Sequence, residues 1–393
     1  MSVGHPQRSS VLAYHEQTKH TPASVRRLGP GLDWANRPHP FKEYRELPPR
    51  PLPVRLETLL RLGAGVRRER RYPGGLVYHF RTYASAGALY PVEVYVADEE
   101  GLFHFHPREL ALRQLRAEDV RGALAEAASD SGLAEAETVL VLTGILWRTA
   151  WKYRARGYRH LYWDAGTMLA NLLAVAAAEG REARLGAAFV DAAVNRLVGV
   201  DGRREAALAL LRVSRSQPAP KTGALGEIDL PVEPLSAREV EYPQAYAAHE
   251  ASSLRSPEKV RAFRAFSAGS VPPPVLSLPE LERVLARRGS TREFSSTPIA
   301  GEDLRFLLAF ASAGIPADFP PLTEVFVVVH AVDGLAPGAY RFTDGEFVLL
   351  REGSDRRLAG RLCLEQSLGA RAAALVFFLA DLERVVALLG ERG

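Results

Sequence analysis

The segment RTYASAGALYPVEVY, residues 81–95, decides the fold of this 393-residue chain. Residues 92–97 alternate in the manner of a strand, and residues 102–106 and 110–115 predict its neighbours in one sheet. Ahead of the first strand, residues 85–88 (SAGA) are all small, so the backbone can approach a flat ligand and direct N–H groups toward it. A tight turn explains the same small residues, so this run alone leaves both interpretations open.

Helical periodicity surrounds these strands. Residues 158–180 give the strongest helical signal, which ends at Gly180. Further helices are expected at residues 10–19, 54–64, 117–129, 146–156 and 192–198, and further strands at residues 138–143, 185–189 and 207–213. Together these elements predict an α+β domain over residues 1–213.

A shorter version of the same pattern returns after residue 281. Helix, strand, hairpin, strand and helix are expected at residues 304–311, 325–332, 338–350, 370–379 and 382–393, in the order seen earlier in the chain. An offset of 236 residues places Gly393 on Gly157. We therefore predict a tandem repeat whose second copy, residues 281–393, is C-terminally incomplete. Residues 214–280 are rich in proline (LPVEPLS, VPPPVLSLP) and predict a linker with one helix at residues 257–266.

Composition narrows the class of protein. Apolar residues make up 47% and charged residues 24% of the chain, as in soluble globular proteins. The single cysteine, Cys363, excludes an intramolecular disulfide and a cysteine-rich metal site. A net charge of +4, with acids among the bases, argues against a nucleic-acid binder. Without a membrane-length apolar run or a signal-peptide core, we expect a cytoplasmic protein.

Two histidines share one face of a predicted strand, because His104 and His106 are two residues apart. We expect both to be exposed and to bind no metal, since no third ligand is expected nearby.

A basic motif, RRGSTREF, occupies residues 287–294 just before a predicted helix. Arg288, Ser290 and Arg292 can surround a phosphate with two guanidinium groups and a hydroxyl. A solvated basic helix end explains the motif equally well.

A second basic motif, WKYRARGYR, leads into the long helix at residues 151–159. Only five of the 50 basic residues are lysines, and one of them, Lys152, adjoins Tyr153. Their ordinary pKa values, about 10.4 and 10, are too high for a base at neutral pH. Neighbouring cations would lower the pKa of both groups. The plain alternative is a basic helix end with surface ion pairs.

These motifs together resemble the flavin-dependent nitroreductase superfamily, and within it the azoline-oxidase branch (SagB-type, thiazole/oxazole oxidases). The branch pattern R…SxGxLYPxEVY matches Arg81, Ser85, Gly87 and residues 89–91 and 93–95. Its Lys-Tyr ahead of RGYR…DxG matches Lys152, Tyr153, residues 156–159, Asp164 and Gly166. YHEQTK at residues 14–19 resembles the opening motif of the branch, and RRGSTREF resembles a nitroreductase phosphate motif.

The resemblance implies an α+β, nitroreductase-like fold, with an antiparallel sheet flanked by helices and FMN held between two copies of the domain. Here the copies would form a tandem pseudo-dimer within one chain, joined by helix 158–180. One flavin site would work and one would be vestigial, because Leu388 and Leu389 replace the Lys-Tyr pair and residues 318–321 lack Ser-x-Gly. The residues expected to bind FMN are Arg288, Ser290 and Arg292 at the phosphate and Arg81, Ser85, Ala86 and Gly87 at the isoalloxazine. His15, Thr18 and Lys19 form the alternative phosphate set.

The implied reaction oxidises an azoline ring of a ribosomally made peptide to an azole. Hydride would pass to flavin N5 while Lys152 and Tyr153 transfer the proton. A modified peptide or small molecule is the expected substrate, a cyclodehydratase-type protein is an expected partner, and further homo-oligomerisation stays open. Two alternatives remain: an NAD(P)H-dependent nitro or quinone reductase that does not need the Lys-Tyr pair, and a non-catalytic scaffold that binds flavin or a partner protein.

Overall fold

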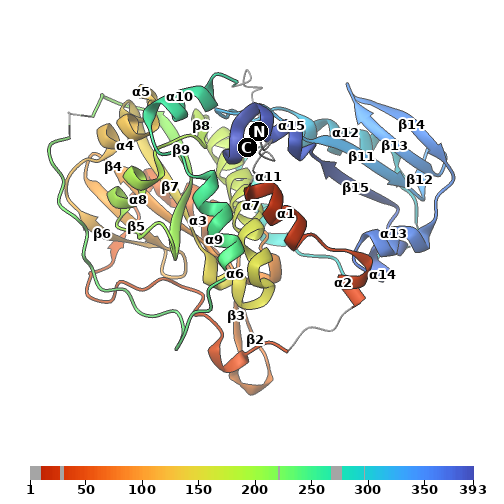
Figure 1. Ribbon diagram of the computed structural model, residues 1–393, viewed down its shortest axis with the longest axis horizontal. Helices are drawn as coiled ribbons and strands as arrows, with labels where there is room; N and C mark the ends of the chain where they lie inside the picture. Colours follow the sequence, from red (N-terminus) through yellow and green to blue (C-terminus); the bar gives the residue numbers. More distant parts are fainter. Residues whose placement is uncertain (1–9, 27–30, 220–221, 267–276, 296) are drawn as a thin grey trace, which may run out of the picture.

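The computed structural model describes residues 10–26, 31–219, 222–266, 277–295 and 297–393. Two antiparallel sheets lie on opposite sides of the central helices α7 (Gly157–Ala178) and α11 (Leu278–Arg287), as Figure 1 shows. The described part of residues 214–280 crosses the first half and carries two helices, α9 (Pro243–Ser252) and α10 (Pro257–Arg264).

The first sheet has seven strands in the order β1-β6-β5-β4-β7-β9-β8, and every neighbouring pair is antiparallel. Its strands are β1 (Arg50–Pro51), β4 (Val92–Asp98), β5 (Gly101–His106), β6 (Ala111–Arg116), β7 (Ala136–Ile145), β8 (Ala183–Gly186) and β9 (Glu205–Arg215). Val94 and Val96 of β4 pack into one core, and Tyr95 and Ala97 pack into a second core on the opposite face. Both faces are therefore buried, as the alternation of these residues requires.

Helices cover both faces of this sheet. The core on one face contains residues of α3 (Val54–Ala64) and α7, and the core on the other contains residues of α4 (Arg121–Ala128), α5 (Ser131–Ala134) and α8 (Asp191–Val198). Helices α3 and α7 approach closely at Gly63, where a Cβ would lie 2.3 Å from Leu172 Cδ2. A side chain at Gly63 would therefore push the two helices apart.

The stretch Leu146–Ala178, which contains α6 (Leu146–Tyr153) and α7, is long and apolar enough to cross a membrane by length and composition. In the structure it packs in the core against α3 and the residues of α11, with Met168 and Leu172 fully buried. It is thus the helix on which both halves of the chain meet.

The second sheet has four strands in the order β14-β13-β11-β15, all antiparallel. They are β11 (Glu324–Val329), β13 (Gly338–Thr343), β14 (Glu346–Glu352) and β15 (Ala374–Leu379). This order repeats β6-β5-β4-β7 of the first sheet, with α12 (Gly301–Ser312) ahead of the strands as α3 is in the first half. Helices α13 (Arg356–Leu362), α14 (Ser367–Arg371) and α15 (Leu382–Leu389) complete the half.

Two sequence expectations need correction. Ahead of α11, the described part of residues 214–280 contains two helices rather than one, and α9 was missed because its buried residues, Ala245 and Ala248, are small and give little periodic signal. A two-stranded ribbon, β2 (Val66–Arg71) with β3 (Val77–Arg81), was also missed, because its arginine-rich first strand lacks apolar alternation. The proposed boundaries at residues 213 and 281 stay a prediction.

Candidate active site

The loop after β3 is fixed to helix α7 by two side chains of that helix, Asp164 and Thr167. Asp164 accepts hydrogen bonds from the Ser85 hydroxyl and, at 3.0 Å, from the Ala86 amide. The Tyr90 amide donates to Ser85 Oγ at 2.8 Å, and Thr167 Oγ1 donates to the Ala84 carbonyl at 2.5 Å. The polar groups of Ser85 and Ala86, expected at a ligand, therefore face Asp164 and define the shape of the loop.

Asp164 is only 3% exposed, and burial raises its pKa to about 6. The bonds from Ser85 and Ala86 oppose that rise because they stabilise the carboxylate. The anchor of the loop is consequently a group that gains or loses its proton in mildly acidic solution.

Gly87 brings the loop to the end of helix α6. Its φ is +66°, a conformation that favours glycine. A Cβ at this position would lie 3.0 Å from Lys152 Nζ and 3.0 Å from the Tyr153 hydroxyl. The structure thus brings together three residues that sequence motifs singled out separately.

The surroundings of Lys152 and Tyr153 differ from the sequence expectation. Burial lowers the pKa of Lys152, so the direction was correct but the main cause is desolvation rather than neighbouring cations. The pKa of Tyr153 is raised, first by burial and then by the charge of Asp164, so the expected lowering was wrong. Within the described ranges, Lys152 forms no ion pair with a carboxylate.

Arg81 lies beneath the loop. It is 2% exposed, and its guanidinium donates to the Val92 carbonyl at 3.1 Å and the Pro40 carbonyl at 2.9 Å. Its cation also lies over the Tyr90 ring, 5.3 Å from the centroid. In this structure Arg81 braces the loop from inside the protein.

The RRGSTREF motif of the second half reaches the same loop through one residue. Arg288 Nε donates to the Thr82 carbonyl at 3.3 Å, while Ser290 and Arg292 are exposed. Arg67 fixes this approach, because it donates to the carbonyls of Leu285 and Ala286 at 2.9 and 2.7 Å. A basic segment of the second half therefore borders the small-residue loop of the first.

A second cationic cluster joins helix α1 (Ser10–Thr18) to the start of α7, and the sequence indicated its α1 residues as the alternative phosphate set but not its two arginines. Arg156 donates to the Thr18 carbonyl at 2.8 Å, and Arg159 donates to Thr18 Oγ1 at 2.7 Å. His15 lies 3.3 Å from Arg159, and its pKa is lowered by burial and by that cation. Lys19 pairs with Glu16, whereas the two arginines have no carboxylate partner in the described part of the chain. The alternative phosphate set is thus extended by both arginines.

His160 is a buried residue that no motif indicated. Its ring lies 4.1 Å from that of Tyr153 and 4.8 Å from that of Trp163. Burial, followed by the charges of Arg156 and Arg159, lowers its pKa to about 4. Neither ring nitrogen has a hydrogen-bond partner among the described residues. A neutral imidazole therefore supports the Tyr153 ring.

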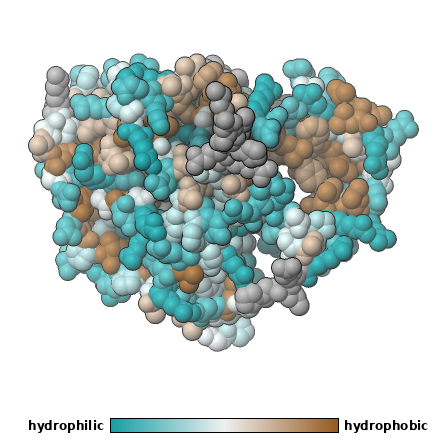
Figure 2. All heavy atoms as spheres, in the orientation of Figure 1, coloured by the Kyte–Doolittle hydropathy of each residue, from teal (hydrophilic) through white to brown (hydrophobic). Residues whose placement is uncertain are grey.

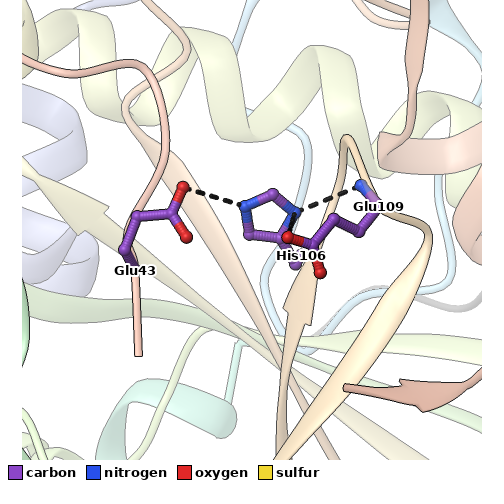
Figure 3. A group of neighbouring side chains, drawn as sticks. All are labelled: Glu43, His106 and Glu109. Atoms are coloured by element: carbon purple, nitrogen blue, oxygen red, sulfur yellow. Dashed lines mark hydrogen bonds and ion pairs between the residues drawn. The ribbon is translucent and has the colours of Figure 1, made fainter. Parts of the chain in front are cut away.

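Figure 3 shows the cluster of Glu43, His106 and Glu109, the one group of possible metal ligands among the residues described. His106 Nε2 lies 3.3 Å from Glu43, and the Glu109 amide donates to Nδ1 at 3.2 Å. His104 is also buried and pairs with Glu93 at 2.9 Å. The expected exposure of both histidines was wrong, because both are buried and contact glutamates of neighbouring segments, from Glu109, three residues from His106, to Glu43, 63 residues away.

In the second half, the segment at residues 318–321 is held by a different acid, Asp318. Asp318 accepts from the amides of Ala187 and Ala188 at 2.7 and 3.1 Å and pairs with Arg264 at 3.0 Å. Leu389, at the end of α15, is buried. This region has apolar packing where the first half has Lys152 and Tyr153.

Comparison with known proteins gives the family of the chain. The Nitroreductase family matches residues 47–214. The candidate nitroreductase MJ1384 of Methanocaldococcus jannaschii is 30% identical over 182 residues, which cover 44% of this chain and 86% of that protein. The chain therefore belongs to the nitroreductase family, and it is an oxidoreductase.

Two further similarities refine this assignment. The microcin B17-processing protein McbC of Escherichia coli is 29% identical over 141 residues, 33% of this chain and 52% of McbC, so the match spans about half of McbC. This match supports the azoline-oxidase branch. A solved structure of a candidate nitroreductase from Anabaena variabilis aligns with a TM-score of 0.80 and 27% identity over 98% of this chain and 88% of that one. Both halves of the fold therefore have a counterpart in a solved structure.

Proposed function

We propose that this protein is an FMN-dependent oxidoreductase that dehydrogenates an azoline-type ring in a modified peptide. The observation that carries the proposal is the meeting of Lys152 and Tyr153 at Gly87. Family membership and the similarity to a peptide-processing protein support it. A cyclodehydratase-type protein that makes the azoline is the expected partner, and the cytoplasm the expected location.

The residues around the loop fit a flat, anionic cofactor. Gly87 has no side chain at the point of closest approach, and Arg288 is an unpaired cation beside Thr82 among the residues described. Arg288, Ser290 and Arg292 would hold the phosphate, and the cluster around Arg156 and Arg159 is the competing set. FMN, when bound, supplies a two-electron acceptor for a hydride.

Two residues of this chain, Lys152 and Tyr153, would handle the proton that leaves the azoline ring. Oxidation of an azoline removes two hydrogens from adjacent ring atoms, one as hydride and one as a proton, and a ring double bond forms. Lys152 is the better acceptor of the proton, because burial lowers its pKa and favours the neutral amine. Tyr153, whose pKa is raised, keeps its proton and can donate a hydrogen bond to the ring.

Spectroscopy and turnover test this proposal together. The purified protein should show a flavin spectrum and release FMN on denaturation, and it should oxidise a synthetic thiazoline peptide with a dye as electron acceptor. Turnover of NAD(P)H with a nitroaromatic, but not of the thiazoline, would indicate the nitro or quinone reductase instead. A protein that turns over neither substrate, whether yellow or colourless, would indicate the scaffold.

A further inference from the structure

The ribbon formed by β2 and β3 stands apart from both sheets. Its strands pair only with each other in the described structure, from Val66 opposite Arg81 to Arg71 opposite Val77. Figure 1 shows it projecting from the edge of the molecule, away from the two sheets. A lone two-stranded ribbon is marginally stable in water, so this one depends on its anchors.

The ribbon carries cations without acidic partners. Arg68, Arg70 and Arg71 are exposed, and in the described chain none of them forms an ion pair. The ribbon's acid, Glu69, already contacts His79 at 3.0 Å and Arg108 at 3.2 Å.

Aromatic rings hold two of these cations in place. The guanidinium of Arg68 lies 5.0 Å from the Phe80 ring centroid, and that of Arg70 lies 4.9 Å from the Tyr72 centroid. Such contacts restrain the side chains while their N–H donors stay free for an anion.

The base of the ribbon is fixed beside the candidate active site. Arg67 is bonded to the two carbonyls at the end of α11, and β3 runs directly into the loop that contains Gly87. The distance from Arg81 to Val77 at the far end of β3 is about 13 Å, because each of the four steps between them rises about 3.3 Å. A polypeptide lying along the ribbon would therefore lead toward Gly87.

We propose that the β2–β3 ribbon binds an extended, acidic segment of the peptide substrate, an inference that rests on the proposed function. The open strand edge offers main-chain donors and acceptors at the spacing of another strand. Arg68, Arg70 and Arg71 supply charge complementary to Asp and Glu side chains. The strand edge favours a peptide over RNA, because nucleic acid has no main-chain ladder to pair with it.

Fluorescence anisotropy with the purified holoprotein tests this inference without any turnover. The probe is a labelled peptide that alternates Glu and Val and contains no heterocycle. Replacing the three arginines (R68E/R70E/R71E) should weaken binding at least about tenfold, the loss expected for charge-assisted contacts. The matched control, R351E/R357E/R384E, removes three exposed arginines of the second half and should leave the affinity unchanged. If the first variant does not fold, R68Q/R70Q/R71Q provides the same comparison.

Three results would overturn the proposal. The first is that the control variant weakens binding of the acidic peptide as much as R68E/R70E/R71E does. The second is that a peptide N-methylated on alternate residues binds as tightly as the unmethylated probe. The third is that single-stranded RNA binds more tightly than the acidic peptide. Flavin content and thiazoline turnover are measured separately on the same samples. A flavin enzyme that ignores the acidic peptide thus contradicts the ribbon alone, and a flavin-free protein that binds it contradicts the proposed function alone.

Discussion

The two sheets share an order of strands but differ in what covers them. In the first, α3 and α7 cover one face, and β9 pairs with β7. In the second, α12 covers part of that face, and β15 pairs only with β11 in the described structure. Phe306 is 68% exposed and Phe378 51%, and Figure 2 shows apolar surface gathered on this half.

The difference extends to the chemistry. In the first half, α6 ends with Lys152 and Tyr153, whose polar groups lie close to Gly87. In the second half, α15 ends with two apolar residues, Leu388 and Leu389. The second half has the same order of strands, and its Arg288 donates a hydrogen bond to Thr82, just ahead of the small-residue loop of the first half. The comparison indicates that one half holds the reactive groups and the other completes their surroundings.

The largest expected effect comes from the ends of the two equivalent helices. Lys152→Ala should lower turnover of a thiazoline peptide by about 10²–10⁴-fold, the usual contribution of a general base. Tyr153→Phe should lower it by about tenfold, the loss of one hydrogen bond to the ring. Leu388→Ala, at the matching position of the second half, should leave turnover within about twofold, and all three proteins should retain flavin. An equal loss of turnover in Leu388→Ala would contradict the conclusion that only the first half holds the reactive groups.

The acid that anchors the loop should make stability depend on pH. The folded protein raises the pKa of Asp164 from 3.8 to about 6, so it binds this proton more tightly than the unfolded chain does. The resulting stability is complete below about pH 4 and is lost as pH rises through 6, a change of about 3 kcal/mol. Denaturant unfolding from pH 4 to 7 should show this trend relative to Asp164→Asn. A constant difference between the two proteins would contradict it.

Because Arg288 of the second half reaches the loop of the first half, replacing it should weaken flavin binding. Arg288→Ala should weaken FMN binding about tenfold to more than a hundredfold, the effect of losing one charge-assisted phosphate contact of about 1.5–3 kcal/mol. Arg292→Ala tests the exposed end of the same motif. Unchanged affinity in both, with loss in Arg156→Ala or Lys19→Ala, would move the phosphate to the α1–α7 cluster.

The smallest effect is expected on the part of the second sheet that α12 leaves exposed, where Phe378 lies opposite Val325 on the same face. Phe378→Ala should change the free energy of unfolding by about 0.5 kcal/mol or less, as surface substitutions do. Leu140→Ala, on the corresponding buried face of the first sheet, is the contrasting control and should cost about 2–5 kcal/mol. Urea unfolding measures both, and a large loss in Phe378→Ala would show that its ring is covered.

Local patterns predicted the elements whose own residues determine them. Alternation located β4, and apolar spacing located α3 and α7 within two residues at each end. These features follow from period and burial alone.

Features that depend on distant partners could not be predicted in this way. The β2–β3 ribbon needs Arg67 bonded to α11, more than two hundred residues away in the sequence. His106 contacts Glu43, 63 residues away in the sequence, and the pKa of Tyr153 is raised first by burial and then by the charge of Asp164. A local sequence pattern cannot predict whether the folded protein places a positive or a negative side chain beside a given residue.

The substitution Lys152→Arg tests the central claim most directly. Arginine keeps the positive charge but cannot accept a proton near neutral pH. The account predicts that this variant retains flavin and loses thiazoline turnover to the same extent as Lys152→Ala. Full activity of Lys152→Arg in the same assay would show that only a cation is required there and would contradict proton transfer by Lys152.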